Sequence, residues 1–132
     1  MADQPTVLVV DDESHIVHVV TLKLQNAGYT VLTAADGEEG LAMAEHHQPD
    51  LLITDYQMPY MTGLELCLEL QKQQAERPIP ALMLTARGLS LASEYTQQAN
   101  IVGLLSKPFS PREVLNKVQA VLAQATETRE AS

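Results

Sequence analysis

The sequence has a single cysteine, no tryptophan, only 8 lysine and arginine residues, and no long hydrophobic run. The lone Cys67 excludes an internal disulfide and is expected to be a small core residue in a reducing compartment. Against the 8 basic residues stand 17 acidic ones, and the net charge of -9 argues against binding to nucleic acid or to an anionic membrane. Because the first apolar run is too short for a signal sequence or a membrane span, we expect a cytoplasmic protein.

The length of 132 residues suits one domain, which at this size buries roughly two thirds of the surface exposed by the unfolded chain. Strand-like and helix-like patterns alternate along the chain, without a repeat, a low-complexity tract or an internal linker. This alternation predicts a single doubly wound α/β domain over residues 1–124. The small and polar residues 125–132 are expected to form a flexible tail.

Hydrophobic patterns and turn residues predict five strands and five helices. Runs rich in valine, leucine and isoleucine predict strands at residues 6–10, 29–34, 51–54, 81–85 and 101–105. Helical spacing and end signals predict helices at residues 14–27, 36–47, 63–74, 89–98 and from 110 onward. Two of these helices begin with residues at the spacing of a capping box, Asp36 with Glu39 and Ser110 with Glu113.

Acidic residues follow two of the predicted strands at the point where each strand ends. Asp11 and Asp12 come directly after the first strand, and Asp55 follows the third. Thr85 ends the fourth strand, and Lys107 comes shortly after the fifth. Since the carboxyl ends of parallel strands meet at one edge of an open sheet, these five side chains are expected to converge there.

A cluster of three carboxylates needs a cation. At about 4 Å and an effective dielectric constant near 20, two carboxylates repel one another by about 4 kcal/mol. Magnesium is a hard ion that prefers one or two carboxylates together with water and phosphoryl oxygens. The cluster of Asp11, Asp12 and Asp55 therefore predicts a magnesium site.

Four segments of the chain together resemble the receiver domain of two-component response regulators, over about residues 5–124. Each segment follows the strand where that family carries it: Val10 to Glu13, Thr54 to Pro59 with Gly63, Thr85 with Ala86, and Lys107 to Phe109. The resemblance implies a flavodoxin-like, five-stranded parallel sheet in the order 2-1-3-4-5, with five helices. It also implies a stand-alone phosphorelay switch and not a turnover enzyme.

The resemblance further implies a role for each matching residue. Asp55 would be phosphorylated by a histidine kinase or a histidine phosphotransfer protein. Magnesium would be bound by Asp12, Asp55 and the main-chain carbonyl of Gln57, while Asp11 would act mainly through a metal-bound water. Thr85, Ala86 and Lys107 would bind the phosphoryl group. The fourth helix, fifth strand and last helix would then present an altered surface to an unknown protein target.

The chain departs from the family pattern three positions before Lys107. Many receivers have an aromatic residue there that changes rotamer on activation, whereas this sequence has Leu104. The preceding Val102 and Gly103 are not the acids often found in the subfamily that dimerises on DNA, so that dimer is not expected. Leu104 is therefore a possible switch position without the aromatic mechanism.

Three other functions are compatible with parts of the pattern. An aspartyl-phosphate hydrolase would use Asp11 as its nucleophile, and Glu13 would be its second acid, but such enzymes need a cap. A flavin carrier on the same sheet would need a polar, uncharged phosphate loop where this chain has acids. A pseudo-receiver would bind a partner without being phosphorylated, and the intact Asp55, Thr85 and Lys107 do not favour it.

Overall fold

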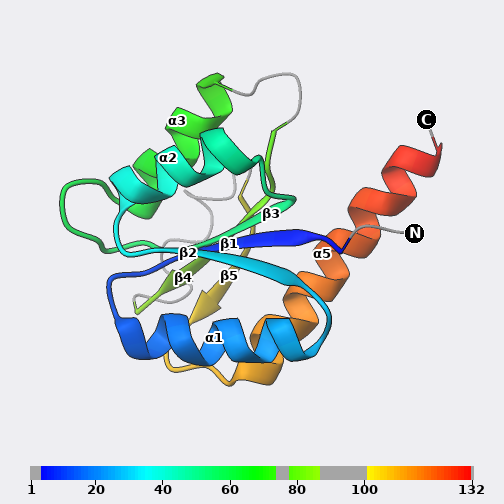
Figure 1. Cartoon of the computed structure of the whole chain (residues 1–132), viewed down its shortest axis with the longest axis horizontal. Coiled ribbons are helices and arrows are strands. Elements are labelled where there is room, and N and C mark those ends of the chain that lie inside the picture. The colour runs from blue at the N-terminus through cyan, green and yellow to red at the C-terminus, as the bar shows by residue number, and fades with distance from the viewer. Residues whose placement is uncertain (1–3, 74–77, 87–100, 132) are drawn as a thin grey trace.

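The computed structural model describes residues 4–73, 78–86 and 101–131, and Figure 1 shows their arrangement. Five strands form one parallel sheet in the order β2-β1-β3-β4-β5, as predicted. The strands are β1 (Thr6–Val10), β2 (Thr30–Ala34), β3 (Leu51–Asp55), β4 (Ala81–Thr85) and β5 (Ile101–Ser106). The change in strand order lies between β1 and β3, where open α/β sheets bind their ligands.

Helices cover both faces of the sheet. In Figure 1, α2 (Gly37–His47) and α3 (Gly63–Gln73) lie on one face, while α1 (Ser14–Asn26) and α5 (Pro111–Ala131) lie on the other. The three central strands β1, β3 and β4 are almost completely buried, because a parallel sheet between two helical layers has no solvated face. None of the helices in the described ranges is long and apolar enough to span a membrane.

The core consists of two clusters, one on each side of the sheet. Alternate residues of β1 belong to different clusters: Leu8 and Val10 pack towards α2 and α3, whereas Val7 and Val9 pack towards α1 and α5. Cys67 of α3 is buried in the first cluster, as predicted, and its burial raises the pKa of the thiol to about 12. A thiol in that state is a packing group and not a nucleophile at neutral pH.

The helix starts follow the predicted capping chemistry. Asp36 accepts a hydrogen bond from the backbone N–H of Glu39 at 2.8 Å, and the Glu39 carboxylate accepts one from the backbone of Ala35 at 2.6 Å. Ser110 and Glu113 form the reciprocal pair at the start of α5, at 3.2 and 3.1 Å. These bonds satisfy backbone donors that the first turn of a helix leaves unpaired, which fixes where each helix begins.

Two of the helix predictions concern the carboxyl-terminal half of the chain. α5 continues to Ala131, past residue 124, where the flexible tail was predicted to begin, and the flexibility of this segment stays a prediction. Residues 125–131 contain no glycine or proline, so nothing in their backbone chemistry stops a helix that has already formed. The helix predicted at residues 89–98 lies outside the described residues, which hold four of the five predicted helices.

Gly63, at the start of α3, holds the loop after β3 tightly against the sheet. Its N–H donates to the Tyr56 carbonyl at 2.8 Å. A Cβ atom built at this position would lie 2.3 Å from the backbone carbonyl oxygen of Asp55 and 2.9 Å from the sulfur of Met83. The backbone cannot move away without moving Asp55 itself, so the position requires glycine.

We therefore expect Gly63→Ala to lower the free energy of unfolding by about 1–3 kcal/mol, the range for forced overpacking. Urea unfolding followed by circular dichroism measures the change. Gly103→Ala is the matched control, because its added Cβ would meet the end of the Leu82 side chain at 3.0 Å and no backbone atom. An equal loss in both variants would contradict the special role of Gly63.

Candidate functional site

Strand pairing brings three carboxylates together at the carboxyl edge of the sheet. Val10 of β1 is paired with Thr54 of β3, so the residues that follow them, Asp11 and Asp55, lie side by side at the carboxyl edge of the sheet. Oxygen atoms of Asp11, Asp12 and Asp55 all lie within 4.8 Å of one another. Asp11 and Asp55 are buried, whereas Asp12 is exposed, so the cluster has one side open to solvent.

Lys107 follows β5, the edge strand at the opposite end of the sheet from β2, and its side chain reaches this cluster. Its backbone N–H donates to the Thr85 carbonyl at 2.9 Å, which anchors the residue at the ends of β4 and β5. Its ammonium nitrogen lies 3.3 Å from Asp11, 3.4 Å from Asp55 and 2.8 Å from Glu13. One ammonium therefore contacts three carboxylates that come from two separate segments of the chain.

The contact between Lys107 and Glu13 was not foreseen. From the sequence, Glu13 was named only within the segment Val10 to Glu13 and as the second acid of a hydrolase. The shortest ion pair of Lys107 is nevertheless with this exposed side chain. The hydrogen bond from Lys107 lowers the pKa of the Glu13 carboxyl. The position of Glu13 directly after Asp11 and Asp12 was the signal in the sequence that it belongs to the site. The direction of its side chain, however, depends on where α1 starts.

Burial and charge oppose one another at the buried acids. Burial, followed by repulsion from Asp11, raises the pKa of Asp55 to about 6, although Lys107 acts in the other direction. Burial also raises the pKa of Asp11, partly offset by the hydrogen bond from the Glu13 backbone at 2.9 Å and by Lys107. For Lys107 itself, burial lowers the pKa, but the hydrogen bond with Glu13 and the charges of Asp11 and Asp55 together raise it. The ammonium thus stays charged.

The remaining predicted residues lie around the cluster. Thr85 is buried at the end of β4, one position after the residue that pairs with Asp55, and Ala86 follows it at the surface. Gln57 is exposed in the loop that follows β3. Leu104 is half-buried in β5 and packs against the core cluster on the α2 and α3 side. The structure thus brings Asp11, Asp12, Asp55 and Lys107 into one site, with Thr85 close to its edge.

The donor set suits a divalent cation. Three carboxylates carry more negative charge than the single ammonium of Lys107 balances, and two of them are buried. Oxygen-only donors with one side open to water are the ligands that Mg²⁺ prefers, because this ion keeps part of its hydration shell. A bound cation would also lower the raised pKa of Asp55.

The raised pKa predicts a stability effect that depends on pH. The Asp55 pKa is about 6 when folded and near 3.8 when unfolded, so the ionised carboxylate disfavours the folded state above pH 6 by about 3 kcal/mol. In magnesium-free buffer at about pH 8, Asp55→Asn is expected to raise the free energy of unfolding by up to that amount. The advantage should shrink as the pH falls from about 6 towards 4, because the native Asp55 then takes up a proton.

Urea unfolding at several pH values measures this effect. Glu45→Gln, which removes an exposed acid on α2, is the control and should change the stability little at any of these pH values. A variant Asp55→Asn that is less stable than the native protein at about pH 8 would show that Asp55 is not under electrostatic strain.

Comparisons with known proteins agree with this geometry. The profile of the response regulator receiver domain matches residues 7–119. The alkaline phosphatase synthesis transcriptional regulatory protein PhoP of Bacillus subtilis is 41% identical over 119 residues, which are 90% of this chain and 49% of PhoP. The transcriptional regulator RpaA of Synechocystis is 36% identical over 118 residues, again 49% of that protein. The chain spans about half the length of these curated relatives.

Solved structures show the same fold. The chemotaxis protein CheY4 of Vibrio cholerae superposes with a TM-score of 0.83 at 39% identity, covering 90% of this chain and 99% of CheY4. A CheY-like receiver domain protein from Methanospirillum hungatei gives a TM-score of 0.87 at 28% identity, covering 96% of this chain and 99% of that one. The chain therefore belongs to the response regulator receiver domain family, and it is a two-component signalling module and not a turnover enzyme.

Proposed function

We propose that this domain is a phosphoacceptor switch in which Asp55 receives a phosphoryl group from a histidine kinase or a histidine phosphotransfer protein. The observation that carries the proposal is the position of the Asp55 carboxylate, which ends the central strand between two other carboxylates and 3.4 Å from the Lys107 ammonium. A carboxylate oxygen attacks phosphorus, the P–N bond of the phosphohistidine breaks, and an acyl phosphate forms on Asp55. Alignment and charge neutralisation supply most of the catalysis of such a transfer.

Asp55 is a better acceptor than Asp11. One carboxylate oxygen of Asp11 accepts the backbone N–H of Glu13, and the other is paired with Lys107. Both oxygens of Asp11 are thus already held, which also disfavours the alternative in which Asp11 is the nucleophile of a hydrolase. A pseudo-receiver would need neither the cluster of acids nor the buried lysine contact, so we place it second.

We assign the magnesium site to Asp12, Asp55 and the main-chain carbonyl of Gln57, with Asp11 acting through a metal-bound water. The exposure of Asp12 supports its direct contact with the ion, since a hydrated ion can approach it from solvent. The two occupied oxygens of Asp11 support the indirect role. When bound, magnesium neutralises charge on the transferring phosphoryl group.

Phosphorylation replaces one carboxylate charge with a group of charge about -2, which acts on the neighbouring donors. We propose that Lys107, the Thr85 hydroxyl and the backbone at Ala86 bind this group. Lys107 would then weaken its contact with Glu13, because one ammonium cannot serve both equally. The signal would pass to the surface of the helix predicted at residues 89–98, β5 and α5. Leu104 would contribute by packing and not by an aromatic rotamer change.

The immediate downstream partner in this proposal is a protein. The net charge of -9 does not favour direct contact with nucleic acid or an anionic membrane. The names of PhoP and RpaA describe transcriptional regulators, but this chain corresponds to only about half of each. The proposal therefore concerns the receiver's own task, which is to accept the phosphoryl group and change its surface.

Incubation with acetyl phosphate and magnesium is expected to add one phosphoryl group to the native protein and none to Asp55→Asn. Intact-mass spectrometry measures the addition, and Asp50→Asn, which changes an acid at the opposite end of β3, is the control that should still accept it. A phosphoryl group of equal yield on Asp55→Asn, or one that maps to Asp11, would reject the assignment. No addition to the native protein would favour the pseudo-receiver.

Magnesium binding should weaken more in Asp12→Asn than in Asp11→Asn, since the first change removes a direct ligand and the second a water-mediated one. Each variant keeps the size of the side chain, so packing changes little. Isothermal titration calorimetry with magnesium chloride ranks the affinities, and we expect the weaker binding in Asp12→Asn because only this variant loses a carboxylate in direct contact with the ion. Unchanged affinity in both variants would show that the ion binds elsewhere.

A further inference from the structure

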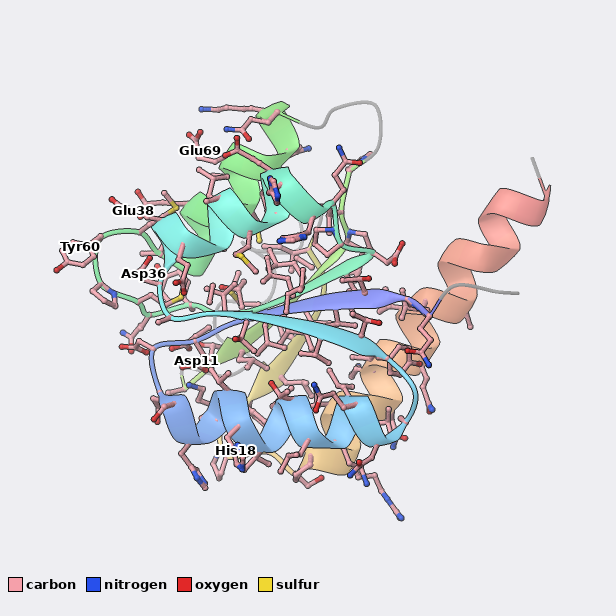
Figure 2. All side chains as sticks on the ribbon, in the orientation of Figure 1. Asp11, His18, Asp36, Glu38, Tyr60 and Glu69 are labelled. Carbon is pink, nitrogen blue, oxygen red and sulfur yellow. The ribbon has the colours of Figure 1, made fainter. Side chains whose placement is uncertain are left out.

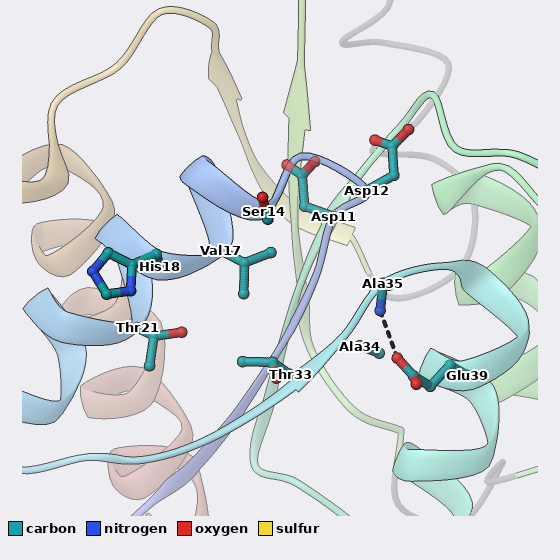
Figure 3. Close-up of a pocket in the computed structure, with 10 residues that line it drawn as sticks. All are labelled: Asp11, Asp12, Ser14, Val17, His18, Thr21, Thr33, Ala34, Ala35 and Glu39. Atoms are coloured by element: carbon teal, nitrogen blue, oxygen red, sulfur yellow. Dashed lines mark hydrogen bonds between the residues drawn. The ribbon is translucent and has the colours of Figure 1, made fainter.

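A cavity of about 380 Å³ opens beside the acidic cluster, between α1 and β2, and Figure 3 shows the side chains that line it. Its volume is within the range of pockets that bind small organic molecules in proteins. Asp11 and Asp12 form the end next to the phosphoacceptor site, and Glu39 of α2 lies at the other side of the opening. The cavity thus adjoins the site described above but extends away from Asp55, which does not line it.

The walls of the cavity are mostly apolar. Val17 of α1 and Ala34 with Ala35 at the end of β2 contribute short aliphatic surface. A small apolar body can therefore displace water from this space with a gain in free energy. The walls alone would accept any small hydrophobic molecule, so the polar groups must determine which kind binds.

The floor of the cavity holds an unsatisfied polar group. The hydroxyl oxygen of Thr21 is buried and has no hydrogen-bond partner, and in Figure 3 it points from α1 towards β2. A buried hydroxyl without a partner disfavours folding, so such groups normally have one. Because this hydroxyl lies in the wall of the cavity, an occupant of the cavity would lie next to it.

The rim of the cavity is negatively charged. Asp12 and Glu39 are both exposed, and neither takes part in any of the salt bridges formed by the described residues. Glu39 accepts a backbone hydrogen bond from Ala35 at the opening of the cavity. Carboxylates without a cation at the mouth of an apolar cavity attract a cation and repel an anion.

We propose that this cavity, which we call the α1–β2 pocket, binds a small organic cation: an ammonium group on a short apolar chain. The ammonium would pair with Asp12, and Glu39 would add electrostatic attraction from the other side of the opening. The chain would lie against Val17 and Ala34, beside the Thr21 hydroxyl. A second part of the inference rests on the proposed function. Since Asp12 is the assigned direct ligand of magnesium, the organic cation and the metal would compete, and the pocket would oppose phosphorylation of Asp55.

The test is a titration of the ¹⁵N-labelled chain with pentylammonium, followed by amide chemical shifts. It is run at about pH 8, where the ammonium group of the probe is charged. Pentylammonium is expected to shift the amides of Thr21, Thr33 and Ala35 in a saturable way. Pentanol, with the same chain and no charge, should bind at least about fivefold more weakly, and pentanoate should not bind. Equal binding of pentanol and pentylammonium would overturn the proposal.

Two pairs of variants localise the recognition. Glu39→Gln removes the charge at the rim but keeps an oxygen that can accept the Ala35 hydrogen bond, and it should weaken pentylammonium binding at least about threefold. Glu38→Gln is the matched control, because this neighbour does not line the pocket and lies on the outer side of α2 in Figure 2. Equal weakening by both variants would reduce the effect to net charge and overturn the specific site.

Thr21→Val tests the floor of the pocket. The change keeps the size of the side chain and removes a hydroxyl without a partner, so the variant should unfold at the same or a higher urea concentration. Thr30→Val, at an exposed position of β2 outside the pocket, is its control. Weaker pentanol and pentylammonium binding by Thr21→Val alone would support contact with the hydroxyl, whereas binding that is unchanged would remove Thr21 from the site.

The source of the cation is tested with a second probe. A free alkylamine and the side chain of lysine offer the same chemistry, and Nα-acetyl-lysine methylamide represents the latter. Tighter binding of pentylammonium would identify a free amine as the occupant, and tighter binding of the lysine derivative would identify a lysine from another protein. Either result supports the cation pocket, and failure of both probes to bind overturns it.

Competition separates this inference from the proposed function. Saturating magnesium should weaken pentylammonium binding severalfold relative to sodium chloride at the same ionic strength, because both cations need Asp12. Binding in the pocket without competition would support the pocket and reject the shared use of Asp12. Magnesium binding and phosphorylation in a chain that binds no pentylammonium would support the receiver function and reject the pocket.

Discussion

The repulsion between carboxylates at the edge of the sheet is the constraint on which the functional part of this molecule depends. Asp11, Asp12 and Asp55 are held within 4.8 Å of one another, and a single ammonium, from Lys107, balances part of their charge. Burial of Asp55 adds to the repulsion and raises its pKa to about 6. The burial of apolar side chains in two core clusters, one on either side of the sheet, offsets the free-energy cost of this repulsion.

Lys107 connects the charges of the site to the rest of the domain. It contacts Asp11, Asp55 and Glu13, and its backbone is bonded to the end of β4 through the Thr85 carbonyl. Any change of charge on Asp55 therefore alters the balance among three ion pairs and acts on the ends of β4 and β5. The proposed switch would need no large movement at the site, because a shift in population between two packings of the neighbouring elements is sufficient.

The α1–β2 pocket shares the negative charge of the acidic cluster, because Asp11 and Asp12 also line the pocket. Asp12 lies between the two, exposed to solvent and shared by the acidic cluster and the pocket. An excess of negative charge that favours a metal on one side also favours an organic cation on the other. Reciprocal competition between two such ligands would follow from this shared carboxylate without any conformational change.

The sequence by itself determined the class of fold, the strand order through its family resemblance, the capped starts of α2 and α5, and the acids at the strand ends, because local patterns specify all of these. Tertiary structure decided what local patterns do not specify. The side chain of Glu13 turns towards Lys107, 94 positions away, only because of how α1 leaves the sheet. Gly63 is required by the Asp55 carbonyl, and the α1–β2 pocket is lined by residues of α1 and β2 that only the fold brings together. Local patterns also did not specify where α5 ends, because small, polar residues favour a tail or a helix according to what precedes them.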